Sequence, residues 1–173
     1  LTAESMSISV RRQVQPVECT GMLGIDRNLE NITVADTESQ AKRYDLSKAT
    51  YVKSSCRRTK QLFLRNDVRV KKQIFRKYGR LERQRVGWLL HNISANIVLQ
   101  AKLRTQAIAM EDLKGIRKLY RRGNGHSSDY RSRMNSWNFR ELQRQIQYKA
   151  DWNGIPIIYV KPYGTPARCS VCG

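Results

Sequence analysis

Alternating apolar and polar residues open the chain and predict β-strands. The first such stretch is SMSISVRR, from Ser5 to Arg12, and the next three cover residues 21–26 (GMLGID), 31–36 (NITVAD) and 41–46 (AKRYDL). The intervening RNLE is typical of a turn and should connect a β-hairpin. We therefore expect an antiparallel meander at the start of the fold.

A long helical region follows, because residues 51–103 contain no proline and only two glycines. We expect two helices that break near Tyr78 and Gly79. The first half is strongly basic, with 13 lysines or arginines and two acids between Tyr51 and Arg85, and is predicted to be a charged arm. The second half has an apolar stripe at steps of three and four residues, which predicts packing on the core. The stripe consists of Val86, Leu90, Ile93, Ile97 and Ala101.

The last third of the chain predicts two further strands and a helix. A short apolar strand covers Thr105 to Asp112 and leads into a small helical stretch, LKGIRKLY. Residues 121–133 have the Gly, Ser and charge content of a mobile loop, residues 138–152 predict a helix, and residues 155–160 (IPIIYV) predict a fully buried strand. Strands separated by helices need crossovers, which favour parallel pairing. The predicted fold is α/β, a mixed sheet with flanking helices.

The charge of the chain points to an anionic partner. There are 33 lysines and arginines against 14 acids, a formal net charge of +19, and nucleic acid is the leading candidate. The basic arm from Lys53 to Arg85 should grip it, whereas Arg140 and Arg144 fit an ordinary solvated helix face equally well. The candidate nucleic-acid-binding residues are Arg57, Arg58, Lys60, Arg69, Lys72, Arg76, Lys77, Arg121, Arg122, Arg140 and Arg144.

The sequence shows no membrane or export signal. It has no apolar run near eighteen residues and no signal-peptide layout, so we expect a cytoplasmic protein without a membrane-spanning helix. The pattern leaves open whether the arm helices pair two chains into a homodimer.

Two acids end strands that should be neighbours near the middle of the sheet. Asp26 follows MLGI, and Glu111 follows AIAM. Paired carboxylates repel each other and favour hard divalent cations such as Mg²⁺ or Mn²⁺, which can activate water against a phosphodiester. Asp26 alone would also suit a turn-initiating aspartate, and Asp112 a helix N-cap, but the N-cap does not explain Glu111.

Near the end of the chain, Cys169 and Cys172 form a CxxC pair after a Gly-Thr-Pro turn. This context favours half of a zinc ribbon over a redox pair, because redox CxxC motifs usually open a helix. A closed zinc site needs four ligands, and no second pair follows within the sequence. Since the first residue is Leu1 and not Met, we expect both ends of the chain to be truncated.

Four motifs, GIDRNLENITVA, AMEDLKGIRKLY, WNFRELQRQIQYKADWNGIPIIYV and TPARCSVCG, resemble in order and spacing the nuclease domain of the OrfB/TnpB family of insertion-sequence proteins. The resemblance implies a RuvC-like, RNase H-type fold and RNA-guided DNA cleavage, with a guide RNA and DNA as partners. It assigns Asp26 and Glu111 as catalytic metal ligands and places a third acid after a complete zinc ribbon. It divides the chain into a nuclease core over residues 1–168, with the basic arm inserted at about 51–103, and the first half of a ribbon at 169–173.

Two functions follow from these expectations. The first is the core of a metal-dependent DNA endonuclease; lacking the third acid and the other half of the zinc site, this chain should bind nucleic acid in a salt-sensitive way, leave Zn²⁺ unbound and cleave poorly. The second is an inactive DNA- or RNA-binding remnant, or an accessory regulator of transposition. A small ribosomal-type RNA-binding protein would explain the charge but not the paired acids.

Overall fold

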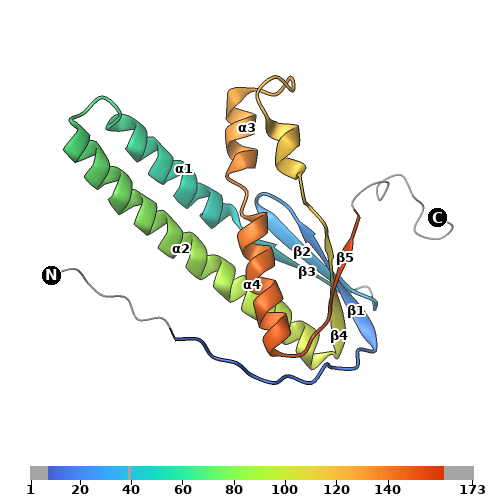
Figure 1. The fold of residues 1–173 in the computed structure, drawn as a ribbon. Coiled ribbons are helices and arrows are strands. Elements are labelled where there is room, and N and C mark those ends of the chain that lie inside the picture. Colours follow the sequence, from blue (N-terminus) through green and yellow to red (C-terminus); the bar gives the residue numbers. More distant parts are fainter. Residues whose placement is uncertain (1–7, 39, 162–173) are drawn as a thin grey trace.

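A five-stranded mixed sheet forms the centre of the fold in the computed structural model, which describes residues 8–38 and 40–161 (Figure 1). The strand order is β3-β2-β1-β4-β5. The first three strands pair antiparallel, and β1 with β4 and β4 with β5 pair parallel. The predicted meander and the predicted parallel crossovers are both confirmed. The strands are β1 (Gly21–Arg27), β2 (Asn31–Asp36), β3 (Ala41–Asp45), β4 (Gln106–Glu111) and β5 (Ile157–Val160).

Helices α2 (Val68–Leu103) and α4 (Phe139–Trp152) cover one face of this sheet, and the first turns of α1 (Ser47–Leu62) reach the same core through Ala49 (Figure 1). Alternate strand residues such as Leu23, Ile25 and Ile108 point into the core that these helices close. The whole apolar stripe predicted on α2 is buried there. A 3-10 helix, η1 (Ile116–Tyr120), and the short helix α3 (Ser128–Asn135) connect β4 to α4. None of the helices in the described ranges is long and apolar enough to cross a membrane.

The prediction of a helix break near Gly79 is wrong. Helix α2 runs without interruption from Val68 to Leu103, and the break lies between α1 and α2. Asp67 begins α2, because its side chain accepts a hydrogen bond from the Arg69 N–H (2.7 Å), which satisfies one of the unpaired donors of the first turn. The α1–α2 hairpin therefore projects from the sheet as two long antiparallel helices (Figure 1).

Replacing Gly79 with alanine is expected to raise the free energy of unfolding by about 0.5–1 kcal/mol, because alanine loses less backbone entropy in a helix interior. A Cβ atom there would lie 3.8 Å from Arg83 Nη1, an ordinary contact. Urea denaturation measures the change. The control Gly115→Ala should destabilise, since Gly115 has φ +82°. A stability loss in Gly79→Ala would contradict a continuous α2.

Two strand predictions also fail in part. Residues 8–12 of the predicted strand Ser5–Arg12 are irregular, because none of the strands of the described sheet pairs with them, and residues 5–7 lie outside the described ranges. The chain after them runs past the end of α4, where Val17 N–H donates to the Gly154 carbonyl (2.8 Å). The strand predicted as fully buried, β5, lies at the sheet edge and pairs only with β4, so Tyr159 is 41% exposed. An apolar run does not tell an edge strand from a central one.

The predicted mobile loop over residues 121–133 contains most of helix α3. Ser127 begins this helix by accepting a hydrogen bond from the Tyr130 N–H (3.2 Å), and Asp129 stands in its first turn. Of this stretch, residues 121–127 lack regular structure. The irregular structure predicted for the Gly-rich half is therefore confirmed, whereas the capping serine outweighs the polar composition of the second half.

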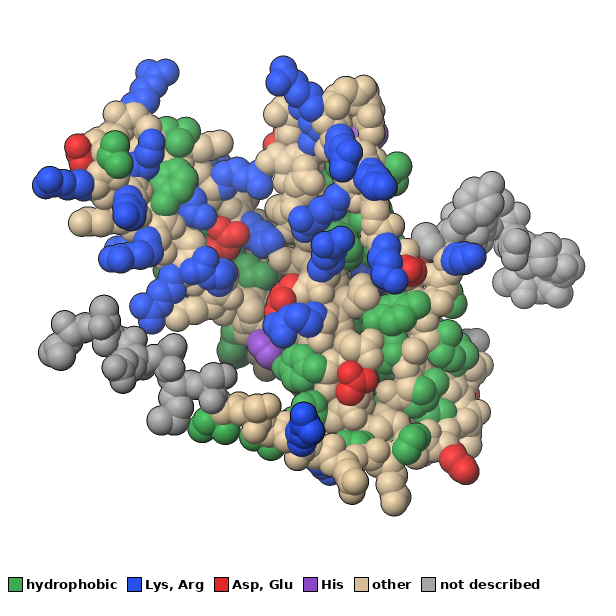
Figure 2. All heavy atoms as spheres, viewed as in Figure 1, with side chains coloured by type: hydrophobic (Ala, Val, Ile, Leu, Met, Phe, Trp, Pro, Cys, Tyr) green, Lys and Arg blue, Asp and Glu red, His purple; other side chains and the backbone are tan. Residues whose placement is uncertain are grey.

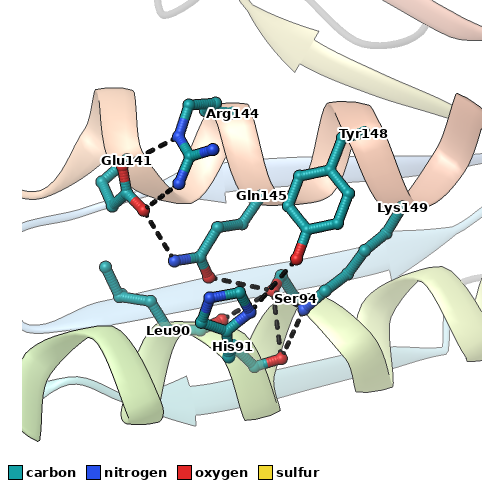
Figure 3. A network of polar contacts seen from close by, with 8 residues as sticks. All are labelled: Leu90, His91, Ser94, Glu141, Arg144, Gln145, Tyr148 and Lys149. Carbon is teal, nitrogen blue, oxygen red and sulfur yellow. Dashed lines mark hydrogen bonds and ion pairs between the residues drawn. The ribbon is translucent and has the colours of Figure 1, made fainter. Parts of the chain in front are cut away.

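A buried polar network fixes how α4 lies on α2 (Figure 3). Ser94 and Gln145 are completely buried, and the Ser94 hydroxyl donates to Gln145 Oε1 (3.3 Å). Gln145 Nε2 donates to Glu141 (2.8 Å), and Lys149 Nζ donates to Ser94 Oγ (2.6 Å). Because each buried polar group has a specific partner, α4 is held in one register along α2.

Candidate metal and nucleic-acid site

Asp26 and Glu111 lie at the carboxyl ends of two neighbouring parallel strands, β1 and β4. The parallel pairing of β1 with β4 places Ile25 opposite Met110, and the two acids are the next positions along each strand. Ile25 and Met110 are buried under the helices, so the alternation of the strands directs both acids to the opposite face. Asp26 is exposed and Glu111 is half-buried. The structure brings together the two acids that the sequence selected.

The hydrogen bonds of Asp26 do not support a turn-initiating role. Its carboxylate accepts from the Asn28 side chain (2.8 Å), and among the described residues no backbone N–H donates to it. The aspartates that do form turns or caps accept the N–H two residues further along, as turn-forming side chains do. These are Asp36, Asp45, Asp67 and Asp112.

The sequence suggested Asp112 as a helix N-cap, but Asp112 does not begin a helix. Its carboxylate accepts the Lys114 N–H (3.1 Å) and pairs with the Lys114 ammonium (3.4 Å), whereas Gly115 is the residue that precedes η1. Asp112 therefore closes a turn directly after β4. This turn fixes the path of the chain directly after Glu111.

Within residues 8–38 and 40–161, no group of three or more His, Cys, Asp or Glu side chains is placed to hold a metal ion. The acid pair therefore offers two carboxylates without a third. Mg²⁺ is commonly bound by one or two carboxylates, with water and substrate phosphate oxygens completing its octahedron. The donor set of Asp26 and Glu111 fits such an ion.

Arg27 is a component of the site that sequence reasoning missed. Its side chain is 3% exposed and donates to the Glu111 carbonyl, to the Phe139 carbonyl (3.4 Å) and to Gln143 Oε1 (3.0 Å). Burial lowers the pKa of Arg27, and the nearby Glu111 carboxylate acts against this. Arg27 thus ties the end of β1 to the end of β4 and to α4. The strand alternation that buries Leu23 and Ile25 was the signal that could have identified it.

Replacing Arg27 with methionine is expected to lower the free energy of unfolding by about 2–3 kcal/mol, because it removes hydrogen bonds to a buried charged group and leaves their acceptors unpaired. Urea denaturation measures the loss. The control Arg43→Met alters an exposed arginine on β3 and should change stability by less than about 0.5 kcal/mol. Equal effects in the two variants would contradict the positioning role of Arg27.

A basic groove of about 790 Å³ lies between α1 and α3, and begins at Leu29 and Glu30 in the turn that follows β1. Lysine and arginine side chains gather on the surface of the α1–α2 hairpin and of the segment around α3 (Figure 2). Hydroxyl donors and guanidinium groups suit a phosphodiester backbone. The cations that line the groove are Lys53, Arg57, Arg58 and Arg133, and the hydroxyl groups are those of Ser47, Thr50, Tyr51, Ser54, Ser128, Ser132 and Ser136.

Several of the predicted nucleic-acid contacts already have partners within the chain. Arg57 donates to the Ser132 side chain across the groove, Lys60 pairs with Glu82 (3.1 Å), and Arg144 pairs with Glu141 (2.7 Å). These bonds lie at or near the surface, where such pairs contribute little to stability. The other predicted cations are exposed and form none of the ion pairs found among the described residues. They are Arg58, Arg69, Lys72, Arg76, Lys77, Arg121, Arg122 and Arg140.

The groove also contains Lys53, the first residue of the predicted basic arm, which was not among the candidate nucleic-acid-binding residues. Lys53 is half-buried on α1 and donates to the Ser136 carbonyl, and burial lowers the pKa of its ammonium group. It therefore fixes the distance between α1 and the segment after α3. The predicted zinc ligands Cys169 and Cys172 lie outside the described residues.

The chain is similar to several known proteins. Residues 139–173 match the protein family described as Cas12f1-like, TNB domain. The TnpB-like protein MJ0751 of Methanocaldococcus jannaschii is 33% identical over 178 residues, which cover 98% of this chain and 63% of the relative. The chain belongs to the OrfB/TnpB family. The endodeoxyribonuclease Cas12f2 of a Micrarchaeota archaeon is 32% identical over 165 residues, which cover 90% of this chain and 30% of that protein.

The fold of this OrfB/TnpB-family chain also matches solved structures. A cryo-EM structure of a Cas12f1–sgRNA–target DNA complex aligns with a TM-score of 0.66 at 20% identity, over 95% of this chain and 33% of that one. A CRISPR–Cas12f ternary complex aligns with a TM-score of 0.60 at 21% identity. The likeness establishes a shared fold. The chain spans less than two thirds of the length of each of these relatives.

Proposed function

We propose that this chain is the nucleic-acid-binding core of an RNA-guided DNA endonuclease of transposon origin, built on an RNase H-like, RuvC-type sheet. The observation that carries the proposal is the position of Asp26 and Glu111 on adjacent parallel strands, beside the turn where the basic groove begins. The relatives include endodeoxyribonucleases, and the solved Cas12f1 structure holds a guide RNA and target DNA. Guide RNA and DNA are accordingly the proposed partners.

In this proposal Asp26 and Glu111 supply oxygen ligands to Mg²⁺ or Mn²⁺. When bound, such an ion polarises a phosphoryl oxygen and lowers the pKa of a coordinated water. Asn28 orients the Asp26 carboxylate, and Arg27 holds the backbone of Glu111, so the two acids keep a fixed separation. The groove between α1 and α3, which begins at Leu29 and Glu30 in the turn after β1, holds the phosphodiester backbone.

Cys169 and Cys172 are proposed to supply two of the four ligands of a zinc ribbon. Both lie in the segment that matches the Cas12f1-like TNB domain. A tetrahedral structural site takes its other two ligands from a further Cys or His pair.

A second candidate function is nucleic-acid binding without catalysis. The observation that favours it is the absence of a third acid beside Asp26 and Glu111 among the described residues. A site with two protein carboxylates holds its ion less firmly than one with three, and cleavage slows accordingly. Binding would then be the main activity of this chain.

Cleavage and binding assays on one set of labelled oligonucleotides separate the two functions. The endonuclease proposal expects DNA cleavage, even if slow, that requires Mg²⁺ or Mn²⁺ and stops when EDTA is added. The binding alternative expects stable complexes with single-stranded DNA or RNA and intact DNA under every metal condition. Failure to bind any nucleic acid would contradict both.

A further inference from the structure

Two large aromatic side chains stand exposed on the α1–α2 hairpin. Tyr51 on α1 is 72% exposed, and Trp88 on α2 is 67% exposed. Both line a shallow cavity of about 450 Å³ with the half-buried Val52 and Leu89. Tyr51, Val52, Trp88 and Leu89 are called the aromatic patch below. Trp88 takes no part in the core, whereas Val86 and Leu90 on either side of it are buried.

The rim of the aromatic patch is cationic. Lys48 and Arg85 border the cavity, together with Gln84. An apolar floor inside a positive rim suits a ligand with flat apolar faces and negative groups at its edge. A second copy of this chain would bring cationic rims together on proteins that each carry a net charge of +19, which is unfavourable. Charge therefore favours a nucleic-acid occupant.

The aromatic patch is continuous with the basic groove. Tyr51 lines both the groove between α1 and α3 and the cavity that contains Trp88. A strand whose phosphates lie against Arg57 and Arg58 in the groove can place its next bases on the patch. One surface then combines a backbone track with a stacking platform, which is the arrangement that binds single strands.

We propose that Trp88 and Tyr51 stack the bases of a single-stranded nucleic acid, while Lys48 and Arg85 contact its phosphates. Stacking needs unpaired bases, because the faces of paired bases are covered within a duplex. The site therefore discriminates single strands from duplexes without reading sequence. This inference rests on the proposed nucleic-acid function, and it adds the strandedness of the ligand and the residues that recognise it.

The test compares variants of the 173-residue chain with a fluorescent single-stranded DNA 20-mer and the matching duplex. Trp88→Ala is expected to weaken single-strand binding about tenfold and duplex binding less than about twofold. Trp88→Phe should keep most of the affinity. The matched control is Trp152→Ala, which removes a 42%-exposed tryptophan at the end of α4 and should leave single-strand binding unchanged. Circular dichroism checks that each variant is folded.

Each outcome decides a separate question. If wild type binds both ligands and Trp88→Ala binds the single strand equally well, the stacking site is contradicted and the proposed function stands. The stacking site is likewise contradicted if Trp88→Ala weakens binding to the single strand and to the duplex equally. It is also contradicted if analytical sedimentation shows that the wild-type chain self-associates and that Trp88→Ala abolishes this self-association. If wild type binds no nucleic acid, the proposed function and the stacking site fail together.

Discussion

Replacing Asp26 with asparagine is expected to weaken Mn²⁺ binding to the chain by about a hundredfold. The substitution removes one of two anionic ligands and leaves Glu111 alone, and even changes to groups that only orient metal ligands cost roughly ten- to a hundredfold in affinity. Electron paramagnetic resonance of free Mn²⁺ measures the dissociation constant. Glu111→Gln should show a loss of similar size.

The matched control for these variants is Glu38→Gln. It removes the same unit of negative charge from an exposed residue in the turn between β2 and β3, away from the acid pair. Its Mn²⁺ affinity should stay within about twofold of wild type. An equal loss in all three variants would mean that the ion responds to net charge, and the paired site would be contradicted.

Binding of the chain to double-stranded DNA is expected to weaken by about a thousandfold or more between roughly 50 and 200 mM salt. A surface that neutralises roughly six to ten phosphates releases as many condensed counterions, and affinity falls steeply with salt. Fluorescence anisotropy over a salt series gives the slope of log affinity against log salt.

The cations of the groove are expected to contribute a measurable part of this salt dependence. Replacing Arg57 and Arg58 with glutamine removes two of its cations, neither of which pairs with a carboxylate among the described residues, and should reduce the magnitude of the slope by about two. The double variant Arg11→Gln, Arg12→Gln removes two exposed arginines in the segment before β1 and serves as the matched control. A flat salt dependence, or equal slopes in the two double variants, would contradict the groove as a phosphate track.

Much of the sheet was predictable because its signals are local or follow from chain order. Strict alternation located β1 and β2, and the crossovers through helices required β4 to pair parallel. The adjacency of Asp26 and Glu111 followed from that order alone. The buried stripe on α2 followed from its period of three and four residues.

The failures arose where two local signals competed or where tertiary position decides. Gly79 is a weak helix breaker that a long packed helix tolerates, whereas Asp67 is a strong capping residue that the sequence-based prediction did not consider. For β5, the apolar run carried no information about which strand stands at the edge. Arg27 was overlooked because RNLE was assigned to the turn, whereas β1 continues to Arg27 and its alternation places this side chain inside, a rare position for arginine.

The groove and the aromatic patch could not be predicted from the sequence, because each is formed by residues that lie far apart along the chain. Arg57 and Ser132 meet across the groove although 75 residues separate them. Tyr51 and Trp88 become neighbours only because the turn after Leu62 reverses the chain, so that α2 packs antiparallel against α1. A pattern along one helix shows a charged face but not the surface opposite it.

A metal ion held by the acid pair beside the bound strand can be located by replacing Mg²⁺ with Fe²⁺ in the presence of ascorbate, peroxide and bound, labelled single-stranded DNA. Hydroxyl radicals form at the bound iron and cut the nearest polypeptide and nucleic acid. We predict scission near residues 24–28 and 109–113 and at a discrete position in the DNA, all suppressed by excess Mg²⁺ and lost in Asp26→Asn. Scission elsewhere in the chain, or an unchanged pattern in Asp26→Asn, would contradict a metal site at this position.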